Sequence, residues 1–371
     1  MLLAAPRMLT PDGLTGPAWL ETDGERIAAC GTGAFPRPPD EVVDGLVSPG
    51  FVDIHSHGGG GANFGADPAA ARTVLATHAA HGTTTMVASL VTGTLDDLAE
   101  AVAALSEVVA AGELAGVHLE GPWLSPEYKG AHEVSLLRDP RIEDVAHILD
   151  AGEPGTVRLV TIAPERPGAM DVIPYFVERG VTVAVGHTAA DDACARAAIA
   201  AGARGATHLF NAMPELLHRA PGPALALWST PEVWVELVCD GVHVAADLVA
   251  HVMTTKSDRC VLITDAMAAA GSRDGDYRLG GLAVEVRDGV ARLAGSSTIA
   301  GSTLTLDRAV RTAVGAGVPL ELALRAATAH PADYLGLTDV GRLAPGTFAD
   351  LVVLDEALAV TRVMRRGAWI G

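Results

Sequence analysis

The chain has 371 residues, and its 26 basic and 45 acidic side chains give a formal net charge of −19. Hydrophobic residues make up 49% of the sequence and charged residues 19%, so the chain can form a large buried core and is not disordered. The negative charge argues against nucleic acid or an anionic membrane as a partner, because long-range repulsion would oppose encounter. No apolar run is long enough to span a bilayer.

The four cysteines lie far apart in the sequence and form no closely spaced pair. The first ten residues also lack the apolar stretch and the small-residue cleavage site of a secretory signal. Both observations predict a cytoplasmic protein with reduced thiols.

The first 48 residues have the pattern of short strands and turns, and from Pro49 onward short apolar runs alternate with amphipathic helical patterns. Asp67 before Pro68, and Thr94 with Asp97, are typical of helix N-termini. The predicted strands are 51–54, 84–88, 115–119, 157–162, 181–185, 205–209, 233–238 and 260–264. Strand–helix alternation repeated eight times predicts an α/β fold, a closed (β/α)8 TIM barrel.

The two ends of the chain carry strands that cannot join this barrel. After the eighth strand we expect a β-rich segment at 277–293, helices near 303–314 and 320–335, and a strand pair at 350–354 and 359–362. The first and last strands are expected to pair with each other as a small β-sandwich domain. The predicted domains are 1–48 and 339–371 for this β-domain and 49–338 for the barrel.

Histidine and carboxylate side chains stand at the ends of the predicted barrel strands, where a barrel places its active site. They are His55, His57, Glu120, His187, His208, Asp240, His243 and Asp265. Burying so many polar groups unpaired at one rim would be costly, so a shared metal cation is the economical explanation.

The spacing of these residues suits metal binding. His55 and His57 can approach one ion from a single extended segment. A carboxylate such as Glu120 can bind or bridge divalent cations. His187 and His208 each end an apolar run at the same predicted depth, which makes them the strongest candidate ligands.

Three further residues could take part in the chemistry of the site in different ways. Asp265, beside a metal-bound water, can accept a proton and later protonate a leaving amine. His132 lies on a glycine-flanked loop, and Arg219 offers a planar fork of donors that suits a phosphate. From the residues alone, however, His132 has the pattern of an exposed loop histidine and Arg219 that of a solvated surface arginine.

Six segments of the sequence carry a resemblance to a known family. They are PGFVDIHSHGGGG, HLEGPWLSPEYKGAH, AVGHTAA, THLFNAM, LVCDGVHV and LITDAM, which occur in this order between residues 49 and 302. They resemble the N-acetylglucosamine-6-phosphate deacetylases of the amidohydrolase superfamily. GTFADLVVLD near the C-terminus is similar to the closing β-segment of that superfamily.

The resemblance implies a metal centre. The family's principal metal ligands correspond here to Glu120, His187 and His208. A second metal, in members that have histidines there, corresponds to His55 and His57. One or two divalent ions per subunit are therefore expected, zinc first, with iron, manganese and cobalt open because imidazole and carboxylate suit all of them.

The resemblance also implies catalytic and substrate-binding residues. The catalytic acid and base of the family corresponds to Asp265. The implied substrate contacts are Ala131, His132, Asn211, Ala212, Arg219, Asp240, His243, Ile299, Ala300 and Gly301. Of these, Arg219 and His243 are expected near the phosphate.

The implied activity is removal of the acetyl group of N-acetylglucosamine-6-phosphate, which gives glucosamine-6-phosphate and acetate in amino-sugar catabolism. A metal-bound hydroxide would attack the amide, and Asp265 would pass the proton to the amine. Because the family tends to be dimeric, we expect a homodimer whose partner subunit could supply part of the phosphate site. The sequence leaves open the glucosamine or galactosamine configuration and the tolerance for larger acyl groups.

Two alternatives stay open. Another amidohydrolase could act on a related N-acyl sugar or an acyl-amino acid, and many such enzymes resemble one another in using a carboxylated lysine as metal bridge. The only lysines here, Lys129 and Lys256, do not close a predicted strand, so Glu120 would have to take that place. A non-catalytic barrel scaffold is the remote alternative, and the complete set of candidate ligands argues against it.

Overall fold

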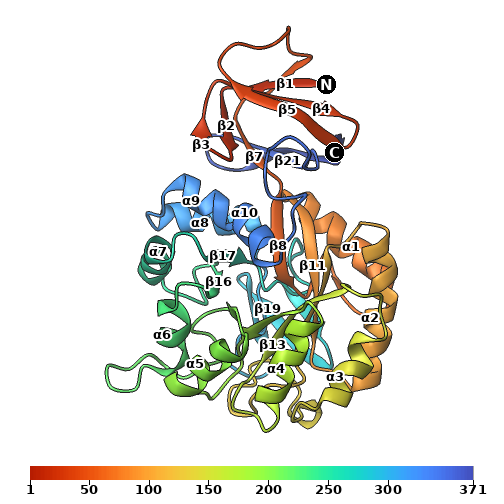
Figure 1. Ribbon diagram of the computed structural model, residues 1–371, viewed down its shortest axis with the longest axis vertical. Coiled ribbons are helices and arrows are strands. Elements are labelled where there is room, and N and C mark those ends of the chain that lie inside the picture. Colours follow the sequence, from red (N-terminus) through yellow and green to blue (C-terminus); the bar gives the residue numbers. More distant parts are fainter. Residues whose placement is uncertain (371) are drawn as a thin grey trace.

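The structure, a computed structural model, describes residues 1–370 and is built around an eight-stranded parallel sheet (Figure 1). In chain order, which is also their order around the sheet, the strands are β8 (Phe51–Ser56), β11 (Thr83–Val91), β12 (Gly116–Glu120), β13 (Val157–Ile162), β14 (Thr182–Val185), β15 (Gly205–Ala206), β16 (Trp234–Val238) and β17 (Cys260–Ile263). The sheet closes where the backbone N–H of Asp265, after β17, donates to the carbonyl oxygen of His55 in β8 over 2.8 Å. The predicted (β/α)8 barrel is confirmed.

Two of the barrel strands differ clearly from their predicted limits. β11 continues to Val91, and β15 ends at Ala206 although the prediction extended it to residue 209. His208 and Phe210 have φ angles of 28° and 77°, which an extended strand does not adopt. The sixth strand is therefore cut short at a candidate ligand.

Helices surround the sheet (Figure 1). They are α1 (Pro68–Ala79), α2 (Leu95–Ala110), α3 (Ile142–Leu149), α4 (Ala169–Glu178), α5 (Asp192–Ala201), α6 (Gly222–Ser229), α7 (Ala246–Thr255) and α8 (Leu306–Gly315). The expected N-caps are confirmed, because the Asp67 carboxylate accepts from the N–H of Ala69 at 2.9 Å and the Thr94 hydroxyl accepts from that of Asp97 at 3.1 Å. Within residues 1–370, no helix has the length and apolar character needed to cross a membrane.

The helix predicted at 320–335 is in fact two helices, α9 (Leu320–Ala326) and α10 (Ala329–Tyr334). Pro331 has no N–H, so a continuous helix would lose the bond to the carbonyl of Ala327 and bring the proline ring against it. Thr328, at the break, has a non-helical backbone with φ −134° and ψ −82°.

The two ends of the chain build an all-β unit of two sheets, which lies above the barrel in Figure 1. The first sheet contains, in spatial order, β5 (Arg26–Thr32), β4 (Ala18–Asp23), β1 (Leu2–Ala5) and β6 (Glu41–Val42). The second contains β23 (Ala368–Ile370), β22 (Val360–Arg365), β21 (Leu351–Leu354), β7 (Leu46–Pro49), β2 (Arg7–Thr10) and β3 (Gly13–Thr15). One hydrophobic cluster joins both sheets through side chains such as Leu3, Leu20, Leu351 and Met364.

The predicted pairing of the two chain ends is confirmed where β7 lies antiparallel to β21. β22 continues beyond its predicted limit, and β23 was not predicted. β7 ends at Pro49 and β8 begins at Phe51, close to the expected limit between residues 48 and 49. The domain limits themselves stay a prediction, and Gly371 lies outside the described residues.

The β-rich segment expected after the eighth barrel strand is a three-stranded antiparallel sheet. Its strands are β18 (Gly275–Leu279), β19 (Leu282–Arg287) and β20 (Val290–Leu293). Its apolar side chains share a cluster with Met267 and Ala268, which follow β17. The segment is thus attached to the carboxyl rim of the barrel, where Leu279 lines a pocket.

Asp53 connects the first and last barrel strands from inside. Its buried carboxylate accepts from the hydroxyl of Thr264 at 2.6 Å and from the backbone N–H groups of Thr264 and His55, each at 3.3 Å. These bonds hold the segment that leads into Asp265.

Replacing this acceptor is expected to weaken barrel closure. Asp53→Ala leaves buried donors without a partner, so the free energy of unfolding should fall by about 2 to 4 kcal/mol, measured by denaturant titration. Asp276→Ala is the control, since Asp276 is exposed and its ion pair with Arg287 should be worth less than about 0.5 kcal/mol. Equal losses in the two variants would contradict a closing role for Asp53.

Candidate active site

A pocket of about 410 Å³ opens at the carboxyl ends of the barrel strands, within the usual range of about 300–1,000 Å³ for small-molecule sites. Its lining includes His57, Glu120, Ala131, His132, His187, His208, Asn211, Ala212, His243, Asp265, Ile299 and Gly301. Most of the residues singled out from the sequence therefore meet in one cavity.

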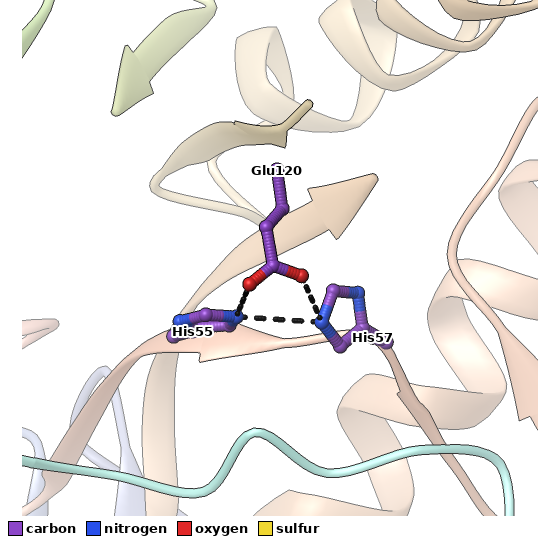
Figure 2. Close-up of side chains that lie close together, drawn as sticks. All are labelled: His55, His57 and Glu120. Carbon is purple, nitrogen blue, oxygen red and sulfur yellow. Dashed lines mark hydrogen bonds and ion pairs between the residues drawn. The ribbon is translucent and has the colours of Figure 1, made fainter. Parts of the chain in front are cut away.

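The Glu120 carboxylate, at the end of β12, lies at the centre of the histidine cluster. Its Oε1 atom is 3.4 Å from Nε2 of His55 and its Oε2 atom is 3.1 Å from Nε2 of His57. Figure 2 draws both contacts as dashed lines. Oε1 also lies 3.3 Å from Nε2 of His187 and 3.2 Å from Nε2 of His208. Two groups that could each hold a metal ion, His55–His57–Glu120 and Glu120–His187–His208, therefore share one carboxylate.

The backbone at this rim is unusual. His187, His208 and Asp265 each follow a strand and have φ angles of 46°, 28° and 48°. Such left-handed conformations are unfavourable for non-glycine residues and persist where the surrounding structure imposes them. Here they turn three side chains toward the same cavity as Glu120.

In three histidines, the Nδ1 nitrogen, which is not the one facing Glu120, contacts an oxygen that can only accept a hydrogen bond. Nδ1 of His55 lies 3.2 Å from a Glu236 carboxylate oxygen, and Nδ1 of His57 lies 3.2 Å from the carbonyl oxygen of Ser89. Nδ1 of His187 lies 2.8 Å from a carbonyl oxygen, that of Tyr128. In the neutral ring these acceptors assign the proton to Nδ1, so the Nε2 lone pairs are directed at Glu120 and available to a metal.

The electrostatics of the cluster also favour a cation. Burial lowers the pKa of His57, but the Asp265 and Glu120 carboxylates outweigh it and raise that pKa to about 9. Burial would raise the pKa of Glu120, yet the surrounding imidazoles hold it well below its usual range. The ligand atoms thus attract positive charge, and a nitrogen and carboxylate donor set fits zinc or a related divalent ion.

Asp265 lies on the His55–His57 side of the cluster. Its Oδ1 atom is 3.2 Å from Nε2 of His57 and 3.6 Å from Nε2 of His55. Its backbone carbonyl accepts from the N–H of Ser302 at 2.7 Å, which fixes the residue from the other side. The carboxylate is therefore held beside the ligand atoms and within the pocket.

His132 is buried and does not lie in the exposed position that its loop context indicated, since only 4% of its surface is accessible. The backbone N–H of Thr92 donates to its Nδ1 at 3.4 Å, and the Thr92 hydroxyl lies 2.8 Å from the same atom. Nδ1 is thus the acceptor, so the proton is on Nε2, which is 3.4 Å from Oε2 of Glu120. His132 is arranged as a hydrogen-bond donor rather than as a metal ligand.

Some residues singled out from the sequence do not line the pocket. Asp240 lies behind His243, with its Oδ2 atom 2.7 Å from Nδ1 of His243. Ala300 is buried in the cluster of the β18–β20 sheet. Arg219 is exposed and lies in the turn formed by residues 217–220. It does not line the pocket of its own chain.

Several residues of the site were missed by reasoning from the sequence. Glu236 contacts His55, and its place as the single charged residue in the apolar run 233–238 was a usable signal. Val91, Tyr128 and Leu279 line the pocket. Nothing in their local sequence distinguishes them from ordinary loop or strand residues.

A closed barrel with a histidine–carboxylate centre at its carboxyl rim defines a metal-dependent barrel hydrolase, and comparison with known proteins agrees. The amidohydrolase family model matches residues 46–370. The chain is 36% identical to the N-acetylgalactosamine-6-phosphate deacetylase of Escherichia coli O157:H7 over 99% of this chain and 98% of that protein. It is 35% identical to the N-acetylglucosamine-6-phosphate deacetylase of Vibrio furnissii over 93% and 86% of the two chains.

A solved structure provides a closer comparison. It is an aspartate-to-alanine mutant of N-acetyl-D-glucosamine-6-phosphate deacetylase from Mycobacterium smegmatis in complex with N-acetyl-D-glucosamine-6-phosphate. Its TM-score to this chain is 0.97 at 51% identity, covering 100% of this chain and 98% of that one. The chain belongs to the amidohydrolase family.

The shared carboxylate leads to a prediction about metal content. Glu120→Ala removes a ligand from both groups, so bound divalent metal, measured by elemental analysis, should fall to near zero per chain. His57→Ala removes a ligand from one group only and should leave the Glu120–His187–His208 ion in place. Glu107→Ala, on the exposed face of α2, should retain the wild-type content, and full retention by Glu120→Ala would rule out the shared position.

Proposed function

We propose that this protein is an N-acetylglucosamine-6-phosphate deacetylase, which hydrolyses the acetyl amide to give glucosamine-6-phosphate and acetate. The observation that carries the proposal is the Glu120-centred histidine cluster at the base of a sugar-sized pocket, with Asp265 beside it. Relatives with this named activity align with nearly the whole chain, which supports the same assignment.

The chain's own residues supply the remaining chemistry. A divalent metal, when bound by the cluster, polarises the amide carbonyl and lowers the pKa of a water molecule. Asp265 is positioned to accept the proton of the attacking water as the C–O bond forms and to deliver it to the amine nitrogen as the C–N bond breaks. His132, protonated on Nε2, is positioned to donate a hydrogen bond to the carbonyl oxygen, where negative charge develops.

We further propose two zinc ions per chain. The first would be held by Glu120, His187 and His208, and the second by His55, His57 and the same glutamate. The orientation of the Nε2 atoms supports both positions. Iron, manganese and cobalt have compatible ligand chemistry and are the alternatives to zinc.

The phosphate end of the substrate is assigned to His243 and Arg219. His243 lines the pocket, and although burial lowers its pKa, the contact with Asp240 raises it overall, which favours the cationic form that binds a phosphate. Arg219 lies in an exposed turn beside Leu217, which is 53% exposed. We propose that a homodimer buries this turn and that Arg219 completes the phosphate site of the partner copy.

A cytoplasmic location is also proposed. The four cysteines, Cys30, Cys194, Cys239 and Cys260, are free thiols, the state that a reducing cytoplasm maintains.

Amine release from three substrates tests the proposed function. N-Acetylglucosamine-6-phosphate should be hydrolysed with a kcat/KM about 100-fold above that of N-acetylglucosamine, because charge-assisted bonds to the phosphate are worth about 1.5–3 kcal/mol each. N-Acetylgalactosamine-6-phosphate, run alongside, identifies the preferred sugar configuration. Equal rates with and without phosphate would contradict the roles of Arg219 and His243, and no release from any substrate would contradict the activity. As an internal control, Asp265→Asn should lower kcat by about 100- to 10,000-fold with unchanged metal content.

The Asp240–His243 contact predicts a pH effect on substrate binding. Because Asp240 raises the pKa of His243, the cationic form persists to higher pH, and KM should rise only once the pH exceeds this raised value. Asp240→Asn removes this effect and lowers the pKa of His243, so the rise in KM should move to lower pH. A KM profile from about pH 6 to about pH 9 measures the shift. The unphosphorylated sugar should show no such rise, and an unmoved profile in the variant would disprove the coupling.

A further inference from the structure

Glu236 is a fully buried carboxylate in the middle of β16, and its neighbours along the strand are apolar. Its Oε2 atom lies 3.2 Å from Nδ1 of His55, which is its one ion-pair partner within residues 1–370. Its Oε1 atom has no hydrogen-bond partner there, and neither has the hydroxyl of Tyr334 from α10. Burial raises the pKa of Tyr334 well above its ordinary value, and the negative charge of Glu236 raises it further.

A buried carboxylate without a cationic partner is costly, because desolvation disfavours its charge by several kcal/mol. Neither lysine nor arginine approaches Glu236 in the described part of the chain. The charge therefore needs a cation that acts through His55, whose Nε2 atom points to the ligand cluster. A proton or a metal ion on that Nε2 atom supplies it.

The other candidate ligands lack this charge. The Nδ1 atoms of His57 and His187 donate to neutral backbone carbonyls, and Nδ1 of His208 has no partner among the described residues. Among these four histidines, only His55 has a carboxylate at its Nδ1 atom, which makes its Nε2 atom the most basic of the four. With two divalent ions, the charges of Glu120 and Asp265 leave the centre at +2, and Glu236 lowers this to +1.

We propose that Glu236 is a positioning residue that secures the second divalent cation, the one bound by His55, His57 and Glu120. It fixes the His55 ring with the proton on Nδ1 and increases the basicity of the ligating nitrogen. The inference rests on the proposed metal-dependent function and extends it, since it assigns the occupancy of one ion to a residue outside the pocket.

Metal titration separates this role from a packing role. Glu236→Gln keeps the size and a hydrogen-bond acceptor but removes the charge, so affinity for the second zinc ion should fall by about 10- to 100-fold. The affinity for the first ion should be unchanged, and the melting temperature of the metal-free protein should not fall. Tyr334→Phe, which removes the unpartnered hydroxyl facing the same interior, is the matched control and should bind both ions like the wild type.

A double-mutant cycle completes the test. His55→Ala should itself lose the second ion, and adding Glu236→Gln should then weaken metal binding no further, because Glu236 acts through His55. If the glutamine variant does not fold, Glu236→Asp, which keeps the charge at a shorter reach, should weaken the second ion alone. Wild-type affinity for both ions in Glu236→Gln or Glu236→Asp would overturn the proposal, as would a wild type that binds a single ion. Deacetylation is assayed separately, so a failed activity with an intact zinc titration would count against the substrate and not against Glu236.

Discussion

The site depends on one carboxylate, Glu120, held among imidazoles that come from distant parts of the sequence. Its strand, β12, pairs in parallel with β11 and β13, in a register that places Glu120 level with Val91 and Thr161. Parallel strands end at a common rim, so residues separated by dozens of positions arrive at one depth. The ligand atoms that attract a cation therefore meet at one position in the pocket, around Glu120.

The contacts that close the barrel also position the active-site residue Asp265. The last strand leads directly into Asp265, which has a left-handed backbone and donates its N–H to His55. Asp53 holds the residue before it, and Ser302 holds its carbonyl. The strained conformation is thus stabilised on both sides, which keeps the carboxylate aimed at the cluster without help from the substrate.

The sequence allowed the barrel and most of the cluster to be predicted, because both follow from local features. An apolar run that ends in histidine or aspartate is visible in the sequence, and barrel topology then brings such ends together. Glu236 was missed because its importance depends on what lies across the barrel, namely His55. For the same reason the burial of His132 could not be predicted, since it depends on how a long loop folds back. The exposed position of Arg219 agrees with the solvated surface arginine that the residues alone indicated.

The role of each histidine in this pocket depends on the hydrogen-bond partner of its Nδ1 atom, and not on residue type alone. A carboxylate or carbonyl oxygen there, as at His55 and His187, accepts a hydrogen bond from the Nδ1–H group and leaves the Nε2 lone pair for a metal. A donor there, the N–H of Thr92, places the proton of His132 on Nε2, so this ring presents an N–H donor to the pocket. The adjacent rings of His187 and His132 therefore present a lone pair and an N–H group, respectively, to the pocket. The neighbours that cause this difference lie outside any short sequence motif. A charged acceptor such as Glu236 has a further effect, because it increases the basicity of the Nε2 lone pair and so its attraction for a cation.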